Sequence, residues 1–174
     1  MTPKARYSSS QPPDKSHDRD SFNCGVEPLN VYLKKYALQN QKKDAARTYV
    51  VTNEENRIAG YYTLVFGSVS QAEATSEVSS GLGKYPIPII LLARLAIDTS
   101  EKGKGLGKAL VRDALLRAIR AAEIAGLRAV LVHAKDEAAK NFYRKLGFKS
   151  APHNEFHLFM KMPDIRASLA GGEE

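Results

Sequence analysis

The sequence predicts an α/β (α+β) fold, and three observations lead to this prediction. Residues 87–97 (IPIILLARLAI) are apolar nearly throughout, as expected for a central strand that is covered on both faces. From Leu106 to Ala122 apolar residues repeat at helical spacing, which indicates a long amphipathic helix ending at Gly126. Strand and helix patterns then alternate along the rest of the chain.

The predicted elements follow the order helix, strand, strand, loop, strand, helix, strand, helix, strand. The first helix is expected from Glu27, with Pro28 in its first turn, and Gly147 is expected to cap the last helix. Residues rich in β-branched and aromatic side chains predict a hairpin around a polar turn. The other predicted ranges are strands 48–52 and 58–66, a loop at 71–83 with room for one helical turn, strand 127–133, helix 136–146 and strand 155–161.

The chain has 174 residues, enough for one domain with a full core. Residues 1–20 are polar with almost no apolar side chains, so we expect a mobile arm. Residues 21–169 are expected to form a single domain, and residues 170–174 a frayed end.

Composition excludes several classes of protein. A single cysteine, Cys24, rules out a disulfide framework, and no Cys/His cluster has zinc-like spacing, so we expect no metal site. Neither a signal segment nor a membrane-spanning run is recognisable, which favours the cytoplasm and no membrane contact. A net charge of +7 indicates attraction to a phosphorylated cofactor, a nucleic acid or an acidic protein.

The most informative segment is the glycine-rich loop at residues 102–108 (KGKGLGK), between the apolar strand and the long helix. The first amides of a helix lack intrahelical acceptors and favour a bound anion. A dinucleotide fingerprint would need glycine in place of Lys108. A P-loop would need glycine in place of Lys102 and Ser or Thr in place of Ala109, so both motifs fail.

The loop and its surroundings resemble motif A of the GNAT N-acetyltransferases, written Gln/Arg-x-x-Gly-x-Gly/Ala. Lys102-x-x-Gly105-x-Gly107 matches it except that lysine, which lacks the planar fork of arginine, stands first. The segment AAKNFYRKLGF resembles the C-terminal half of the same family. The resemblance implies a GNAT acyl-CoA N-acyltransferase fold, with a central mixed twisted sheet flanked by helices, and acetyl-CoA as cofactor.

The resemblance also implies roles for individual residues. Backbone amides of the loop would hold the pyrophosphate of the cofactor, and the end of the apolar strand would pair with its pantetheine arm. Tyr143 would be the catalytic acid for the departing thiolate, because a phenol with a pKa of about 10 can donate to a thiolate whose conjugate acid has a pKa of about 8.5. The implied cofactor-binding residues are Leu95, Ala96, Ile97, Lys102, Gly103, Lys104, Gly105, Leu106, Gly107, Lys108, Asn141 and Tyr143.

No general base is recognisable on the apolar strand, where Arg94 is the only ionisable residue. A lysine side-chain amine has a pKa of about 10.4, whereas an α-amine has a pKa of about 7.7 to 8.0. A site without a strong base therefore favours an α-amine as the acetyl acceptor.

Further segments resemble the GNAT toxins of bacterial type II toxin–antitoxin pairs, and this similarity runs from about Phe22 to about Leu169. The matching segments are residues 22–25 (FNCG), 29–33 (LNVYL), Ala37-x-Gln39, 47–50 (RTYV) and 92–98 (LARLAID). Such toxins acetylate the α-amino group of the amino acid on charged tRNA and so block translation. The implied partners are charged tRNA, a ribbon-helix-helix antitoxin, a second copy of the chain, and operator DNA only through the antitoxin complex.

Positive side chains are candidates for contact with tRNA. Arg94 stands out because a cation within an apolar strand is costly unless it is paired or lies in a charged groove. The other candidates are Lys34, Lys35, Arg47 and Lys84.

Two alternative functions stay open at this point. One is a GNAT enzyme that acetylates a small-molecule amine or a protein N-terminus, with the same cofactor site and a different acceptor groove. The other is a non-catalytic nucleic-acid-binding or regulatory module that keeps the fold.

Overall fold

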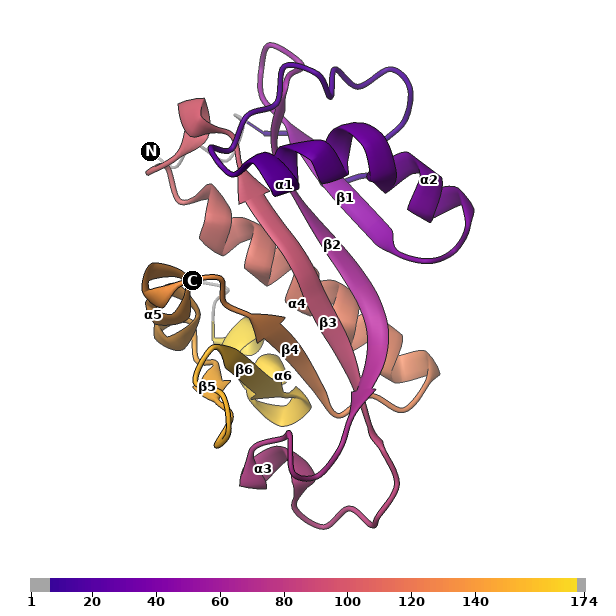
Figure 1. Cartoon of the computed structure of the whole chain (residues 1–174), viewed down its shortest axis with the longest axis vertical. Helices are drawn as coiled ribbons and strands as arrows, with labels where there is room; N and C mark the ends of the chain where they lie inside the picture. The colour runs from indigo at the N-terminus through magenta and orange to yellow at the C-terminus, as the bar shows by residue number, and fades with distance from the viewer. Residues whose placement is uncertain (1–6, 172–174) are drawn as a thin grey trace. The chain divides into compact units, whose positions relative to one another are not determined.

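The computed structural model describes residues 7–171. Its strands form one six-stranded sheet in the order β1-β2-β3-β4-β6-β5 (Figure 1). The chain divides into two compact units, Met1–Val65 with Arg94–Asp113, and Phe66–Ala93 with Ala114–Glu174. The single domain over residues 21–169 stays a prediction, and each unit is described by itself.

The predicted first helix, which lies in the first unit, is confirmed and contains an unexpected π-helical turn. Its parts are α1 (Glu27–Val31), a π-helix (Tyr32–Tyr36) and α2 (Ala37–Lys42). Proline occupies the first turn, where a missing N–H costs nothing. A π-turn inserts one extra residue per turn and is frequently found at functional sites.

The predicted hairpin is also confirmed, as β1 (Arg47–Thr52) and β2 (Ile58–Val69). The strands pair antiparallel from Arg47↔Leu64 to Thr52↔Ile58, with a bulge between Val51 and Thr52. The helical segment packs against the hairpin and the end of β3 (Ile87–Ile97) through one apolar cluster. That cluster consists of Phe22, Cys24, Tyr32, Leu33, Ala37, Val50, Ile58, Tyr61 and Ala96.

The mobile arm over residues 1–20 stays a prediction; residues 1–6 lie outside the described part of the chain, and part of residues 7–20 pairs with β1. Gln11 forms a bridge with Val50 of β1, and the Ser8 amide donates to the Thr52 carbonyl at 2.8 Å. The edge of β1 offers unpaired backbone groups, and an extended segment of almost any sequence can satisfy them.

The second unit contains the C-terminal strands. β4 (Ala129–His133) pairs parallel with β3 over Ile89–Leu92 and antiparallel with β6 (His157–Lys161), which also pairs with the short β5 (Lys149–Ser150). The predicted strands and the helix α5 (Glu137–Lys145) are confirmed, as is one helical turn, α3 (Ser76–Ser79), in the predicted loop.

Two C-terminal elements were not predicted, β5 and the helix α6 (Met162–Ala170). α6 buries Met162, Ile165 and Leu169, and it contacts β6. Its last residue falls in the predicted frayed end, of which residues 172–174 are not described.

The long helix α4 (Leu106–Ile124) runs from the first unit into the second and matches its predicted range closely. Its apolar positions Leu110, Val111, Ala114 and Ala118 are all buried. Among the helices in residues 7–171, none is long and apolar enough to cross a membrane.

Replacing Asn30 by alanine is expected to lower the free energy of unfolding by about 1–3 kcal/mol. The buried Asn30 side chain accepts a hydrogen bond from the Cys24 amide at 2.9 Å, and alanine would leave that amide buried without an acceptor. Urea denaturation measures the difference. The control is Gln39→Ala on the exposed face of α2, for which we expect a change within about 0.5 kcal/mol; equal losses would contradict this account.

Candidate functional site

The turn from β3 into α4 is built around the carboxylate of Asp98. This carboxylate accepts hydrogen bonds from the Ser100 amide at 3.0 Å, the Ser100 hydroxyl at 2.7 Å and the Asn23 amide at 3.0 Å. Burial alone would raise the pKa of Asp98, but these hydrogen bonds outweigh it and the pKa lies below its usual value. The turn therefore fixes the segment Phe22–Gly25 beside the start of the glycine loop.

The glycine loop takes the backbone conformation that the sequence requires. Gly103 and Gly105 have φ values of 78° and 82°, in the left-handed region that favours glycine. α4 begins at Leu106, so the amides of Leu106, Gly107 and Lys108 lie in its first turn without intrahelical acceptors. This arrangement offers amides and a helix dipole to an anion.

The lysines of the loop differ in their surroundings. Lys102 donates from Nζ to the Cys24 carbonyl at 2.8 Å, and Lys104 forms an ion pair with Glu101 at 3.2 Å. Lys108 is exposed on the first turn of α4. The loop thus brings cations and amides together. The Lys102 ammonium already donates one hydrogen bond, to an uncharged carbonyl oxygen.

Glu101 is a buried carboxylate that the sequence did not single out. It accepts hydrogen bonds from the Tyr7 hydroxyl at 2.6 Å, the Asn53 amide at 3.3 Å and the Lys104 ammonium at 3.2 Å. The Tyr7 hydrogen bond is the largest of several causes that hold the pKa of Glu101 below its usual value. A charged residue just before a glycine loop was a usable signal, whereas its partner Tyr7 was not recognisable from the sequence.

Arg94, the cation within the apolar strand, has an aromatic partner. Its guanidinium carbon lies 3.7 Å from the ring centre of Tyr32, within the range of a cation–π interaction. The residues after it, Leu95–Ile97, alternate between half-buried and buried, and the Asp98 amide donates to the Ala59 carbonyl at 2.8 Å. Arg94 therefore directly precedes, on the same strand and in the first unit, the segment predicted to pair with the pantetheine arm.

The other predicted tRNA contacts of this unit lie on its surface. Lys35 is exposed and Lys34 half-buried on the π-helical turn. Arg47 is exposed and forms an ion pair with Asp44 at 2.6 Å, with a further hydrogen bond to the Gln41 carbonyl at 2.9 Å. Lys34 and Lys35 share a helical turn with Tyr32, the partner of Arg94. Arg47 instead binds Gln41 of α2 and Asp44 of the loop before β1.

Tyr143 and Asn141 lie on α5 of the second unit. Asn141 is exposed, whereas Tyr143 is 7% exposed and contacts Phe148 edge-to-face, with ring centres 5.5 Å apart. Burial raises the pKa of the Tyr143 phenol well above its usual value. The hydroxyl therefore keeps its proton at physiological pH and is a weaker acid than the sequence-based comparison with a free phenol assumed.

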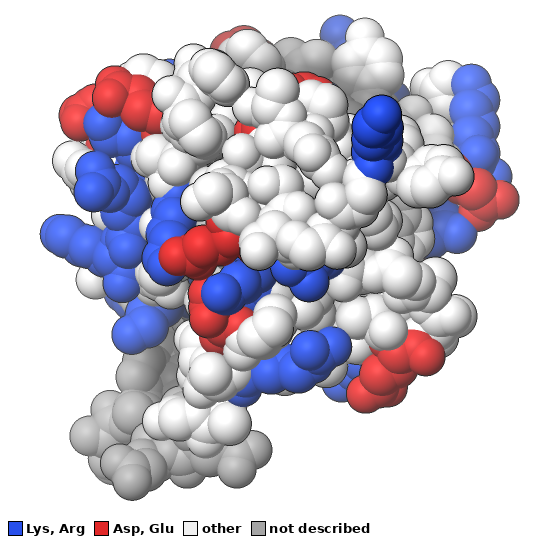
Figure 2. Space-filling model, turned by 90° about the horizontal axis from the view of Figure 1, so that it is seen from below, with Lys and Arg blue, Asp and Glu red and all other residues white. Residues whose placement is uncertain are grey.

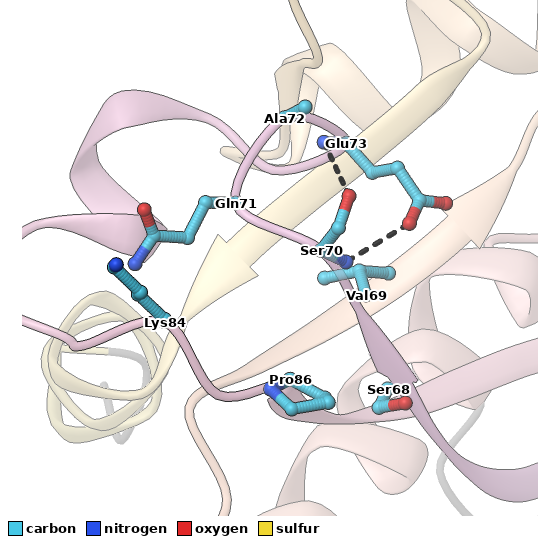
Figure 3. A pocket seen from close by; sticks show the side chains of 8 residues that line it. All are labelled: Ser68, Val69, Ser70, Gln71, Ala72, Glu73, Lys84 and Pro86. Carbon is cyan, nitrogen blue, oxygen red and sulfur yellow. Dashed lines mark hydrogen bonds between the residues drawn. The ribbon is translucent and has the colours of Figure 1, made fainter.

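Lys84 lies in a separate part of the second unit, beside an open pocket of about 470 Å³. In Figure 3 the Lys84 and Gln71 side chains point to the same side, while Ser70 and Glu73 are joined by two hydrogen bonds. The Gln71 amide donates to the Leu82 carbonyl at 2.9 Å and so closes this loop. None of the other predicted site residues lines this pocket.

Charge on the surface is mixed in sign. On the face shown in Figure 2, Lys and Arg side chains form several groups, and Asp and Glu side chains lie beside some of them. The net charge of +7 thus does not form one uninterrupted basic patch on that face.

Comparisons with known proteins identify relatives of similar length. The chain is 41% identical over 163 residues to the tRNA-acetylating toxin of Mycobacterium tuberculosis, covering 94% of this chain and 97% of that protein. The solved structure of AtaT complexed with acetyl-methionyl-tRNAfMet is 29% identical, with a TM-score of 0.84 and coverage of 92% of this chain and 98% of that one. AtaTR bound with AcCoA is 30% identical, with a TM-score of 0.80 and coverage of 94% and 98%.

The family itself is shown by a model described as an acetyltransferase (GNAT) domain, which matches residues 44–150. The match includes the hairpin, the apolar strand, the glycine loop and α5. It covers more than half of the chain, and the fold agrees with that of the solved AtaT structure at the TM-score of 0.84 given above. The chain belongs to the GNAT family of acetyltransferases, which use acetyl-CoA as the acetyl donor.

Proposed function

We propose that this chain is the toxin of a toxin–antitoxin pair, which transfers acetyl from acetyl-CoA to the α-amino group of the amino acid on charged tRNA and so blocks translation. The observation that carries the proposal is the 41% identity, over 94% of the chain, to a tRNA-acetylating toxin. The likeness to AtaT in complex with acetyl-methionyl-tRNAfMet supports the same acceptor.

The glycine loop is the proposed binding segment for the pyrophosphate of acetyl-CoA. Its first-turn amides, the two left-handed glycines and the exposed Lys108 suit a doubly charged phosphate group. Leu95–Ile97 is the proposed partner of the pantetheine arm, because the edge of an extended strand can pair with the amides of that arm. Asn141 is the proposed pantetheine contact on α5.

The proposed reaction needs one acid and no strong base. The amine nitrogen attacks the thioester carbon, the new C–N bond forms, and the C–S bond breaks to release CoA thiolate. Tyr143 Oη donates its proton to the sulfur, and the surplus proton of the amine passes through water to the tyrosinate, which restores the phenol. An α-amine with a pKa of about 7.7 to 8.0 is partly unprotonated at neutral pH, which fits a β3 strand without Asp or Glu.

The proposed partners follow from the same relatives. A structure of AtaT with the C-terminus of the antitoxin AtaR and one of a KacTA–DNA complex support an antitoxin partner and, through it, operator DNA. We further propose that the antitoxin is of the ribbon-helix-helix type, that the chain forms a homodimer, and that it works in the cytoplasm.

Radiolabelled acetyl-CoA distinguishes this function from its alternatives. We expect label on charged tRNA and none on deacylated tRNA, because only the former carries an α-amine. Scintillation counting of precipitated RNA measures the transfer. Label on a protein N-terminus or a small amine, with charged tRNA unlabelled, would contradict the proposal, as would the absence of any turnover.

Replacing Gly105 by alanine is expected to weaken acetyl-CoA binding about 5- to 30-fold. Alanine at a φ of 82° costs about 1–2 kcal/mol, so the loop would shift away from the geometry that holds phosphate. Calorimetry measures the dissociation constant. The control is Gly126→Ala, since a Cβ at either glycine would meet nothing within 4 Å but only Gly105 has a positive φ. Unchanged affinity in both variants would remove the loop from the cofactor site.

Replacing Tyr143 by phenylalanine is expected to lower kcat by about 10²–10⁴-fold and to abolish growth arrest. The ring contact with Phe148 would remain, because only the hydroxyl is removed. Affinity for acetyl-CoA, measured by calorimetry, should stay near that of the native chain. A variant that keeps its kcat would show that Tyr143 is not the acid.

A further inference from the structure

Three aromatic rings of the first unit form a ladder that begins in the core and ends at the surface. Tyr61 stacks on Tyr32 with ring centres 6.4 Å apart and planes 19° apart, and Tyr32 stacks on Tyr36 at 6.4 Å and 30°. Tyr61 and Tyr32 are 0% and 5% exposed, whereas Tyr36 is 50% exposed. The ladder therefore ends in a ring that is open to solvent.

Hydrogen bonds hold the two inner rings of the ladder, Tyr61 and Tyr32, in place. The Tyr61 hydroxyl donates to the Leu29 carbonyl at 2.7 Å, and the Asn40 amide donates to the Tyr32 hydroxyl at 3.3 Å. Phe22 closes the inner end, edge-to-face on Tyr61 with ring centres 5.6 Å apart. Tyr32 and Tyr36 are the first and last residues of the π-helix, and their spacing of four positions makes their side chains neighbours on the helix surface.

Cations accompany the two outer rings of the ladder. Arg94 lies over the Tyr32 ring at 3.7 Å, and Lys34 and Lys35 belong to the same π-helical turn as both tyrosines. Arg19 donates to the Lys34 carbonyl at 3.3 Å and adds a further positive charge. Because Arg94 directly precedes Leu95–Ile97, the ladder adjoins the strand segment proposed to bind the pantetheine arm.

We propose that Tyr36 is a stacking platform for a nucleobase at the aminoacylated 3′ end of charged tRNA. This inference rests on the proposed function and names a contact for its acceptor. Every base has a flat π-face that stacks on an exposed aromatic ring, and neighbouring cations hold the adjoining phosphates. Tyr36 provides the ring, the buried Tyr32 supports it, and Arg94, Lys34 and Lys35 provide the charge.

Steady-state kinetics on the full chain test this platform with two variants. Tyr36→Ala removes the ring, and Tyr36→Leu keeps apolar contact with Tyr32 but has no π-face. We expect either variant to raise the KM for charged tRNA by about 5- to 150-fold, while the KM for acetyl-CoA and the melting temperature stay unchanged. Tyr36→Phe keeps the π-face and should behave like the native chain. The control is Phe66→Ala, another exposed aromatic residue, at 69%, for which we expect an unchanged KM for tRNA.

The contrary outcomes are distinct. A native chain that acetylates charged tRNA, with the same KM for tRNA in Tyr36→Ala and Tyr36→Leu, would overturn the platform and leave the proposed function standing. A native chain that leaves charged tRNA unmodified would overturn both. An unchanged KM for tRNA together with lost antitoxin binding would assign Tyr36 to a protein interface and so also overturn the inference.

Discussion

The position of the candidate cofactor segment depends on the hydrogen bonds that the carboxylate of Asp98 accepts. This residue ends β3, begins the turn into α4 and binds the amide of Asn23. Hydrogen bonds to a charged acceptor are stronger than neutral ones, and here they overcome the cost of partial burial. The Thr99 amide donates to the Asn23 carbonyl at 2.8 Å, so the two segments are joined in both directions. Consequently these hydrogen bonds fix the backbone of the turn that leads into the glycine loop.

Several positive charges of the first unit already have partners within the chain. Lys104 is paired with Glu101, Arg47 with Asp44, and Arg94 lies on the Tyr32 ring. The Arg47–Asp44 pair is exposed and contributes little to stability, so its cation can turn to a phosphate at small cost, whereas Lys104 is paired with the buried Glu101. Backbone amides and the helix dipole, which are fixed by the fold, therefore provide the specific part of anion binding, and the lysines provide general attraction.

The sequence predicted the elements that require a particular kind of residue, such as apolar side chains in a buried strand or glycine in a turn. Residues 87–97 coincide with β3 because a strand buried on both faces must be apolar, and Gly103 and Gly105 mark the turn because few other residues adopt its φ values. Backbone pairing leaves no such signal, so the pairing of Ser8 and Gln11 with β1 was not predicted. The cation of Arg94 indicated a partner, yet its identity as Tyr32 follows only from the tertiary fold.

The central claim is that acetyl is transferred to the α-amine of the amino acid on tRNA, a claim that links the cofactor loop to a site without a strong base. The most direct test is mass spectrometry of the 3′-terminal nucleoside that ribonuclease releases from charged tRNA after reaction with acetyl-CoA. The account predicts an aminoacyl-adenosine heavier by one acetyl group, with fragmentation that places the group on the amino nitrogen. An unmodified aminoacyl-adenosine, or an acetyl group on a base or ribose, would contradict it.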